Sequence, residues 1–137
     1  MPATDRAIEL CLVAARAAAQ KKAEEIIAID VSERLVLTDA FLIVSAANDR
    51  QVRAIVDAID EAMLQAGARR QMREGLTEAH WVLVDYQDLV VHVQQAQDRE
   101  FYDLERLWKD CPRIALPPMD GEDEVVGQDS PVTAVEM

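Results

Sequence analysis

The fold is built around the segment Ala40-Phe41-Leu42-Ile43-Val44-Ser45-Ala46, in which the residues from Phe41 to Val44 are continuously apolar. Successive side chains of a β-strand point to opposite faces of the sheet. An unbroken apolar run therefore predicts a strand that is covered on both faces. An Ile-rich run from Glu25 to Asp30 precedes it and predicts a second strand.

Helical spacing is found on both sides of these strands. Residues 4–22 predict a helix with Thr4 as its N-cap. A second helix is predicted between a cap at Asn48 or Asp49 and Gly67, a residue type that commonly ends helices. The predicted apolar stripes are Ile8, Cys11, Leu12, Ala15 and Ala19 in the first helix, and Val52, Ile55, Val56, Ile59 and Met63 in the second.

The second half of the chain predicts a hairpin and a last helix. Residues 81–85 and 89–93 alternate, and the link between them is short enough for an antiparallel hairpin. Residues 69–77 are polar and predict irregular structure or a short extra element. Residues 99–109, with Asp98 as cap, predict the last helix. Its apolar stripe is Phe101, Leu104, Leu107 and Trp108.

This order of elements predicts an α/β (α+β) fold, a single domain with a mixed β-sheet flanked by helices. The predicted domain covers residues 1–118. Residues 119–137 carry six acidic residues and no Lys or Arg. That composition predicts a disordered acidic tail, because such a segment buries too little apolar surface to fold.

Composition and charge exclude several classes of function. The formal net charge of −12 argues against direct binding of nucleic acid, which depends on Lys and Arg at the phosphates. It favours a basic protein partner, or simply solubility. No apolar run is long enough to span a membrane, and Asp5, Arg6 and Glu9 interrupt any signal peptide. Cys11 and Cys111 match no metal spacing and predict a reducing, cytoplasmic setting, although a disulfide between them stays open.

Motifs for catalysis are missing from the sequence. It contains no GxSxG, GxGxxG or GxxxxGK[ST] pattern and only four glycines, so we expect no enzyme and no cofactor. His80, Asp85 and His92 could form a metal site, but surface or packing roles are the more common use of such residues. A carboxylate cluster on the second helix is more simply a solvated polar face. Its members are Asp57, Asp60 and Glu61.

A partner-binding surface is the more informative hypothesis. Alternation places Trp81, Leu83 and Asp85 on one face of the first hairpin strand, and the opposite face is also apolar. The Trp81 face is either covered by another helix or forms an exposed patch, and Trp is enriched at interface hot spots. His92 lies on the neighbouring strand, either against a partner or as a hydrogen-bonded structural residue.

The last helix adds two candidates for partner contact, Arg99 and Tyr102. Arg99 either contacts a partner or pairs on the surface with Asp103, four residues further on. Tyr102 lies off the apolar stripe, where its hydroxyl can point to solvent or to a partner.

The ordered motifs resemble those of the ribosomal silencing factors, also called the Iojap or YbeB-like family. The resemblance covers about residues 5–109. Each motif alone is weak, and the resemblance is specific because all of the motifs occur in the same order. The motifs are Asp30-Val31-Ser32, Asp39-Ala40-Phe41-Leu42-Ile43-Val44-Ser45, Arg50-Gln51-Val52-x-Ala54-Ile55, Glu74-Gly75, Trp81-x-Leu83-x-Asp85, Val90-Val91-His92-Val93 and Arg99-x-Phe101-Tyr102-x-Leu104-Glu105-x-Leu107-Trp108.

The resemblance implies a concrete function. Members of this family bind the large ribosomal subunit through its ribosomal protein fourteen, block joining of the two subunits and lower translation when nutrients are scarce. Homodimers are seen in some of them. Their fold is similar to that of nucleotidyltransferases, so a nucleotide-binding or nucleotidyltransferase enzyme is the alternative function. The strand ends here in Ser45-Ala46 with no D-x-D after it, which leaves the signature of active nucleotidyltransferases incomplete.

Two loop positions depart from the family pattern. Ala46 stands where the family commonly has Gly after the strand-ending Ser, and Gln87 stands where Gly is common in the hairpin. Because Gly is the usual residue for left-handed turn conformations, Gln87 predicts a different turn geometry in this chain.

Overall fold

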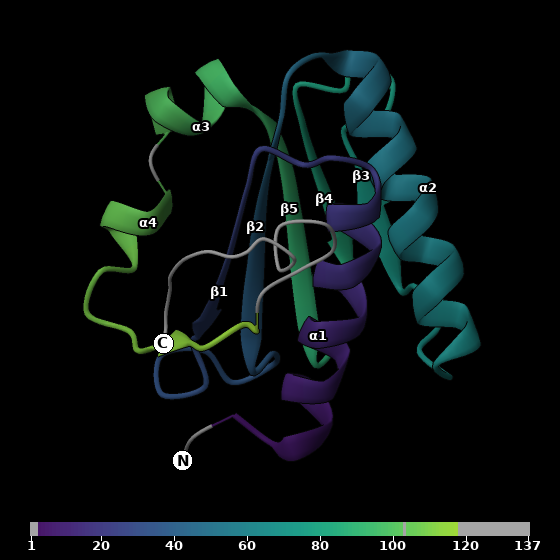
Figure 1. Ribbon diagram of the computed structural model, residues 1–137. Coiled ribbons are helices and arrows are strands. Elements are labelled where there is room, and N and C mark those ends of the chain that lie inside the picture. The colour runs from purple at the N-terminus through teal and green to yellow at the C-terminus, as the bar shows by residue number, and fades with distance from the viewer. Residues whose placement is uncertain (1–2, 103, 118–137) are drawn as a thin grey trace.

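The structure, a computed structural model, describes residues 3–102 and 104–117 (Figure 1). The sheet has six strands in the order β3-β4-β5-β2-β1-β6. The elements along the chain are α1 (Asp5–Gln20), β1 (Glu25–Asp30), β2 (Ala40–Ala46), α2 (Asp49–Gln65), β3 (Met72–Glu74), β4 (Trp81–Asp85), β5 (Leu89–Gln95), α3 (Ala96–Tyr102), α4 (Leu104–Leu107) and β6 (Arg113–Ile114).

The strand predicted from residues 40–46 is confirmed as β2, an inner strand of the sheet. All of its residues are buried. It pairs in parallel with β5 and antiparallel with β1, so the sheet is mixed, as predicted. β4 and β5 form the predicted antiparallel hairpin. The polar segment before it contributes the short edge strand β3.

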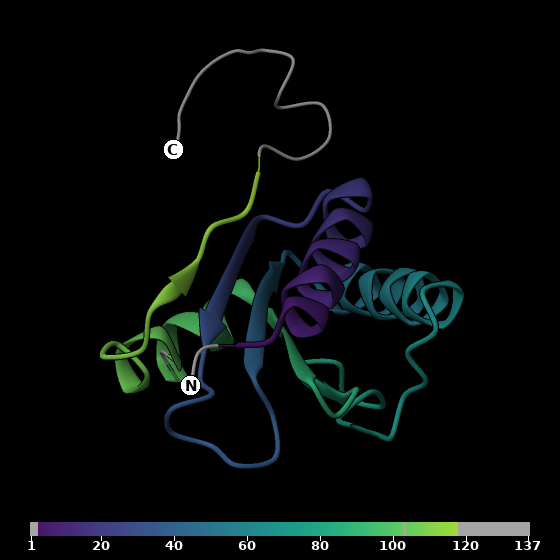
Figure 2. The ribbon, with the colours of Figure 1, turned by 90° about the horizontal axis from the view of Figure 1, so that it is seen from below.

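α1 and α2 lie on the same side of the sheet, which we call the helix face (Figure 2). Thr4 and Asn48 cap these helices, each accepting a backbone N–H with its side chain. The predicted stripe of α2 is buried in full. The stripe predicted for α1 is partly wrong, because Ile8 and Leu12 are only half-buried. The sheet and α2 together bury an alanine-rich face instead, made of Ala7, Leu10, Cys11, Ala14, Ala15, Ala17, Ala18 and Ala19.

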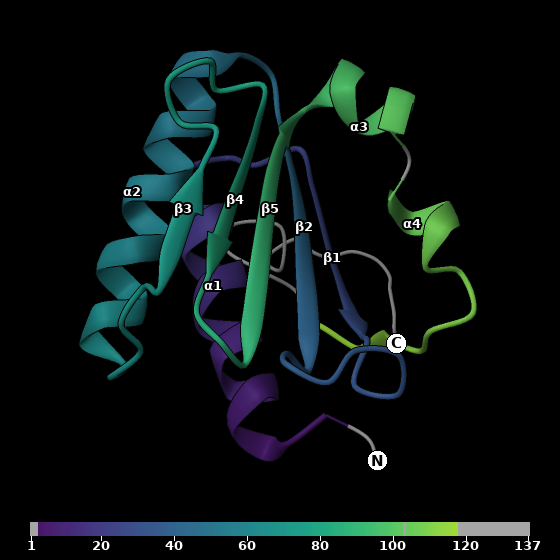
Figure 3. The same ribbon diagram turned by 180° about the vertical axis from the view of Figure 1, so that it is seen from behind.

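The opposite side, which we call the open face, is only partly covered. Its residues on the strands include Ile27, Ile29, Phe41, Ile43, Ser45, Val90, His92, Gln94, Trp81, Leu83, Asp85, Met72 and Glu74. Figure 3 shows α3 and α4 on the side of β2 and β1, whereas β3 and β4 have no helix in front of them. A small second core sits under the covered part, where Trp108 packs against Phe41.

The two cysteines are free and buried. Cys11 belongs to the core under α1 and α2, and Cys111 belongs to the second core on the open face. Burial raises the pKa of the Cys11 thiol to about 12. The disulfide that the sequence left open is therefore not formed, because the sheet separates the two thiols.

The last helix and the C-terminal segment differ from the prediction. In place of one helix over residues 99–109, the chain forms α3 and α4, and residue 103 lies outside the described residues. α3 begins directly after β5, so Asp98 lies in its first turn rather than at its cap. β6 was not predicted; it pairs with β1 over only two residues, too few to leave a sequence signal. The predicted acidic tail lies outside the described residues.

The predicted change of turn geometry at Gln87 is wrong. Gln87 has a φ of 77°, the left-handed conformation that glycine favours. The N–H of Asp88 donates to the carbonyl of Tyr86 at 3.0 Å, and the N–H of Gln87 donates to the Asp85 carboxylate at 2.7 Å. These hydrogen bonds hold a non-glycine residue in a strained conformation.

Replacing Gln87 by Gly should remove that strain. A left-handed non-glycine residue costs about 1–2 kcal/mol, part of which the greater freedom of glycine in the unfolded chain offsets. We expect Gln87→Gly to stabilise the fold by up to about 1 kcal/mol in urea denaturation. Gln87→Ala is the matched control and should bring no such gain. A loss of stability in Gln87→Gly would contradict the strain assigned to this turn.

Candidate functional site

Trp81, Leu83 and Asp85 share the open face of β4, as alternation predicted. Val82 and Val84 point to the helix face and are buried. The three open-face residues are all half-buried, so the strand is neither covered by a helix there nor fully solvated. This arrangement leaves a Trp–Leu pair partly accessible on a rigid strand, which suits an anchor for a protein partner.

His92 supports Trp81 from the neighbouring strand. The indole N–H of Trp81 donates to Nδ1 of His92 at 3.1 Å. His92 is only 5% exposed, and its ring lies edge-on to Phe41 with centroids 4.8 Å apart. Phe41 in turn meets Trp108 at 5.1 Å, and the Arg34 guanidinium lies 5.6 Å from the Trp108 ring. Trp81 is thus the outer end of a chain of packed rings across the open face.

His92 is neutral at physiological pH. Burial lowers its pKa to about 4. Since an indole can only donate, Nδ1 of His92 must be the acceptor and Nε2 must carry the proton. Nε2 is buried and has no hydrogen-bond partner among the described residues. A direct contact of His92 with a partner would require the surrounding side chains to move.

Arg99 holds α3 against the sheet. It is 5% exposed, and its guanidinium donates to the Ser45 hydroxyl at 2.6 Å and to the Glu25 carbonyl at 3.3 Å. The Glu25 carboxylate lies 3.6 Å away. The sequence predicted Arg99 either at a partner or on the surface beside Asp103. The structure instead buries it between α3 and the sheet. Asp103 and the side chain of Tyr102 lie outside what the structure describes.

Gly75 fixes where β4 begins. It has a φ of 91°, and a Cβ atom there would lie 2.2 Å from the carbonyl oxygen of Trp81. The loop can pass the start of β4 only because this residue lacks a side chain. The sequence marked Gly75 as part of a motif but gave no reason for it. Nor did it show that Phe41 and Trp108 support Trp81, because strand register is not visible in one sequence.

The residues predicted as possible metal ligands are not brought together in the described parts of the chain. These parts contain no group of three or more His, Cys, Asp or Glu that could hold a metal ion. His80 pairs with Asp98 at 3.0 Å, whereas His92 is committed to Trp81. Asp60 accepts hydrogen bonds from Tyr86, Arg70 and Arg73 and so ties α2 to the β3–β4 hairpin.

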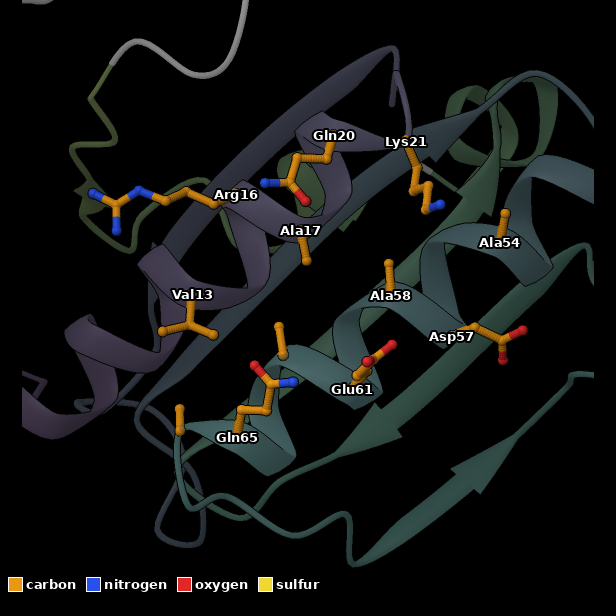
Figure 4. A pocket seen from close by; sticks show the side chains of 12 residues that line it. Val13, Arg16, Ala17, Gln20, Lys21, Ala54, Asp57, Ala58, Glu61 and Gln65 are labelled. Atoms are coloured by element: carbon orange, nitrogen blue, oxygen red, sulfur yellow. The ribbon is translucent and has the colours of Figure 1, made fainter.

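The other two carboxylates of the predicted cluster, Asp57 and Glu61, line a shallow groove of about 830 Å³ between α1 and α2 (Figure 4). Both are exposed, as expected of a solvated helix face. Alanines form much of the groove, and Arg16 and Lys21 lie on the α1 side. None of the helices within residues 3–102 and 104–117 has the length and apolar character needed to cross a membrane.

The fold defines a single-domain α/β protein whose mixed sheet carries long helices on one face only. It is similar to the crystal structure of a protein from Chromobacterium violaceum, with a TM-score of 0.72 and 33% identity over 74% of this chain and 84% of that one. The chain belongs to the ribosomal silencing factor family. The model of that family, described as "Ribosomal silencing factor during starvation", matches residues 4–135.

Named relatives agree with this assignment. The ribosomal silencing factor RsfS of Bacillus subtilis is 42% identical over 76% of this chain and 88% of its own length. The chloroplastic protein Iojap of Zea mays is 33% identical over 75% of this chain and 45% of its own length. The family resemblance seen in the sequence is confirmed, and the family match extends beyond residue 109, where that resemblance ended. The likeness to nucleotidyltransferases stays a prediction.

Of the two glycines that the structure describes, Gly75 should be the less tolerant of a side chain. Gly75→Ala combines a left-handed backbone with a clash against a backbone oxygen, and we expect it to destabilise the fold by roughly 2–4 kcal/mol in urea denaturation. Gly67→Ala is the matched control, because φ there is 87° but the nearest atom is 3.5 Å away on the flexible Arg6 side chain. It should cost only about 1 kcal/mol. Equal costs for the two variants would refute the close approach at Trp81.

His92 should make stability depend on pH. Its pKa is lowered to about 4 in the folded chain from 6.5, so its contribution is fully present above pH 6.5. Between pH 6.5 and 4 only the unfolded chain takes up the proton, and the contribution is lost as the pH falls. We expect the free energy of unfolding to fall by up to about 1.4 kcal/mol per pH unit in this window, and by less in His92→Phe. Identical slopes in the two proteins would contradict a neutral buried His92.

Proposed function

We propose that this protein silences ribosomes by binding: it docks on ribosomal protein fourteen of the large subunit, blocks joining of the small subunit and represses translation when nutrients are limiting. The observation that carries the proposal is the half-buried Trp81–Leu83 pair on β4, in the part of the open face that no helix covers. Family membership supplies the ribosome as the setting. The mechanism needs no catalytic step, because a folded body that occupies the joining surface is sufficient.

The charges of the open face support a protein partner rather than RNA. Glu74 and Asp85 lie on this face around Leu83, and the whole chain has a net charge of −12. Such a surface is repelled by RNA phosphates and attracted to basic protein side chains. Met72, 43% exposed on β3, extends the apolar part of the same surface.

The six residues predicted to bind the partner divide into two groups in this proposal. Trp81, Leu83 and Asp85 contact ribosomal protein fourteen directly, since all three are partly accessible on β4. Tyr102 stays a proposed contact. His92 and Arg99 are buried and act through the residues that they hold. We place the protein in the cytoplasm, where the ribosomal subunits meet.

Homodimer formation is also part of the proposal, with the open face as its site. The sheet edges offer little for a second copy to pair with, because β3 has three residues and β6 has two. The apolar surface around Trp81 and Leu83 is the better contact. A dimer formed there would compete with binding to the ribosome.

Substitution of the anchor should abolish binding without unfolding the protein. We expect Trp81→Ala to weaken binding to isolated large subunits by roughly 30-fold or more, the loss typical of an interface hot spot. Co-sedimentation in sucrose gradients measures the binding, and circular dichroism checks the fold. Fewer joined ribosomes should form when the wild-type protein is added before the small subunit.

The matched control is Leu64→Ala, which removes a 60% exposed leucine from α2 on the other side of the molecule. It should bind as the wild type does. Co-sedimentation of the wild type with small subunits, or equal binding by folded Trp81→Ala and Leu64→Ala, would overturn the proposal.

A further inference from the structure

The orientation of Trp81 is a separate question from its exposure. A half-buried indole on an uncovered strand has two rotatable side-chain bonds and a polar N–H. If the indole turns freely, binding to a partner is weakened by the side-chain entropy that is lost when the ring becomes fixed. An indole that is already fixed avoids that loss. The structure supplies one such constraint in the 3.1 Å hydrogen bond from the indole to His92.

We infer that His92 is a positioning residue for the docking face: its Nδ1 holds the Trp81 indole N–H, so that Trp81 presents an apolar ring in one orientation to the partner. The inference rests on the proposed function for the identity of the partner. The sequence left two roles open for His92, contact with a partner or a hydrogen-bonded structural role, and the inference builds on the second.

The position of His92 suits this role. On β5 it stands directly opposite Leu83 of β4, and it lies beside Ile43 of β2 on its other flank. Phe41 meets its ring edge-on at 4.8 Å. An imidazole enclosed in this way cannot swing away from the indole, so the hydrogen bond transmits the rigidity of the sheet to Trp81.

The cost of a histidine at this position argues for a specific use of its ring. Nε2 carries a proton, is buried and has no partner among the described residues. A phenylalanine would fill similar space without leaving a buried donor unsatisfied. The contact that phenylalanine could not make is the one from Nδ1 to Trp81, and that contact accounts for the imidazole.

Satisfying the indole N–H internally also determines what the partner meets. The N–H is directed into the sheet, so the accessible part of Trp81 is carbon. We therefore expect the partner surface at this point to be an apolar depression rather than a hydrogen-bond acceptor. Charged groups such as Asp85 would then supply the polar contacts at its rim.

The test combines two readouts on the full-length chain. In the wild type, nuclear magnetic resonance should detect a nitrogen–nitrogen coupling across the hydrogen bond between Trp81 Nε1 and His92 Nδ1. In His92→Phe the indole N–H signal, assigned by its loss in Trp81→Phe, should shift and broaden. Affinity for isolated large subunits should fall about tenfold, the equivalent of one ordinary hydrogen bond. His92→Asn, which keeps an acceptor close to the Nδ1 position, should recover most of the affinity.

A double-mutant cycle separates positioning from direct contact. In a Trp81→Phe background, His92→Phe should cause no further loss of affinity. Equal losses with and without the Trp81 indole would overturn the inference, as would absence of the coupling in the wild type. Should His92→Phe fail to fold, the coupling and His92→Asn decide the matter. If the wild type does not bind large subunits, the proposed function fails, and the coupling alone decides whether His92 holds Trp81.

Discussion

The parallel pairing of β2 with β5 determines how the other elements are arranged. It brings Phe41 beside Val90 and Ile43 beside His92, and it requires cover on both faces of β2. α1 and α2 cover one face. α3 and α4 reach only the part of the other face above β1, β2 and β5, where His92 and Gln94 are buried. The part above β3 and β4 is left open, and that is where Trp81 and Leu83 lie.

The proposed docking surface is therefore a consequence of incomplete covering. A third long helix would have buried the Trp–Leu pair and left an ordinary core. The chain instead stabilises the border of the open region from within. Arg99 ties α3 to Ser45 and Glu25, and a series of rings runs from Trp108 through Phe41 and His92 to Trp81. These contacts make a rigid surface from a strand that faces solvent.

Much of the fold could be predicted from the sequence, because the decisive signals are local. Both β1 and β2 have the predicted bounds, and the α2 stripe from Val52 to Met63 is buried as its spacing indicated. The predictions that failed depended on distant parts of the chain. The buried face of α1 is set by α2 and the sheet together, and β6 exists only because β1 is there to pair with it. Gln87 keeps a left-handed turn because its own N–H donates to the Asp85 carboxylate and the N–H of Asp88 donates to the Tyr86 carbonyl.

For the candidate site too, local features could be predicted from the sequence, whereas features that depend on distant parts of the chain could not. Alternation placed Trp81, Leu83 and Asp85 on one face correctly, since the period of a strand is a local property. Whether a helix covers that face could not be predicted from β4 itself, because the covering helices α3 and α4 come from a later part of the chain. The burial of Arg99 and the support of Trp81 by His92 likewise depend on which strands are neighbours and in what register.

In the proposed function, the open face is the surface that meets the large subunit. The most direct measurement places a photo-activated cross-linking amino acid at Met72, on the open face, or at Leu64, on the helix side, and identifies the products formed with large subunits by mass spectrometry. The account predicts that Met72 cross-links to ribosomal protein fourteen and that Leu64 does not. Cross-links from Leu64 to that protein with none from Met72 would show that the opposite face docks, and would contradict the account.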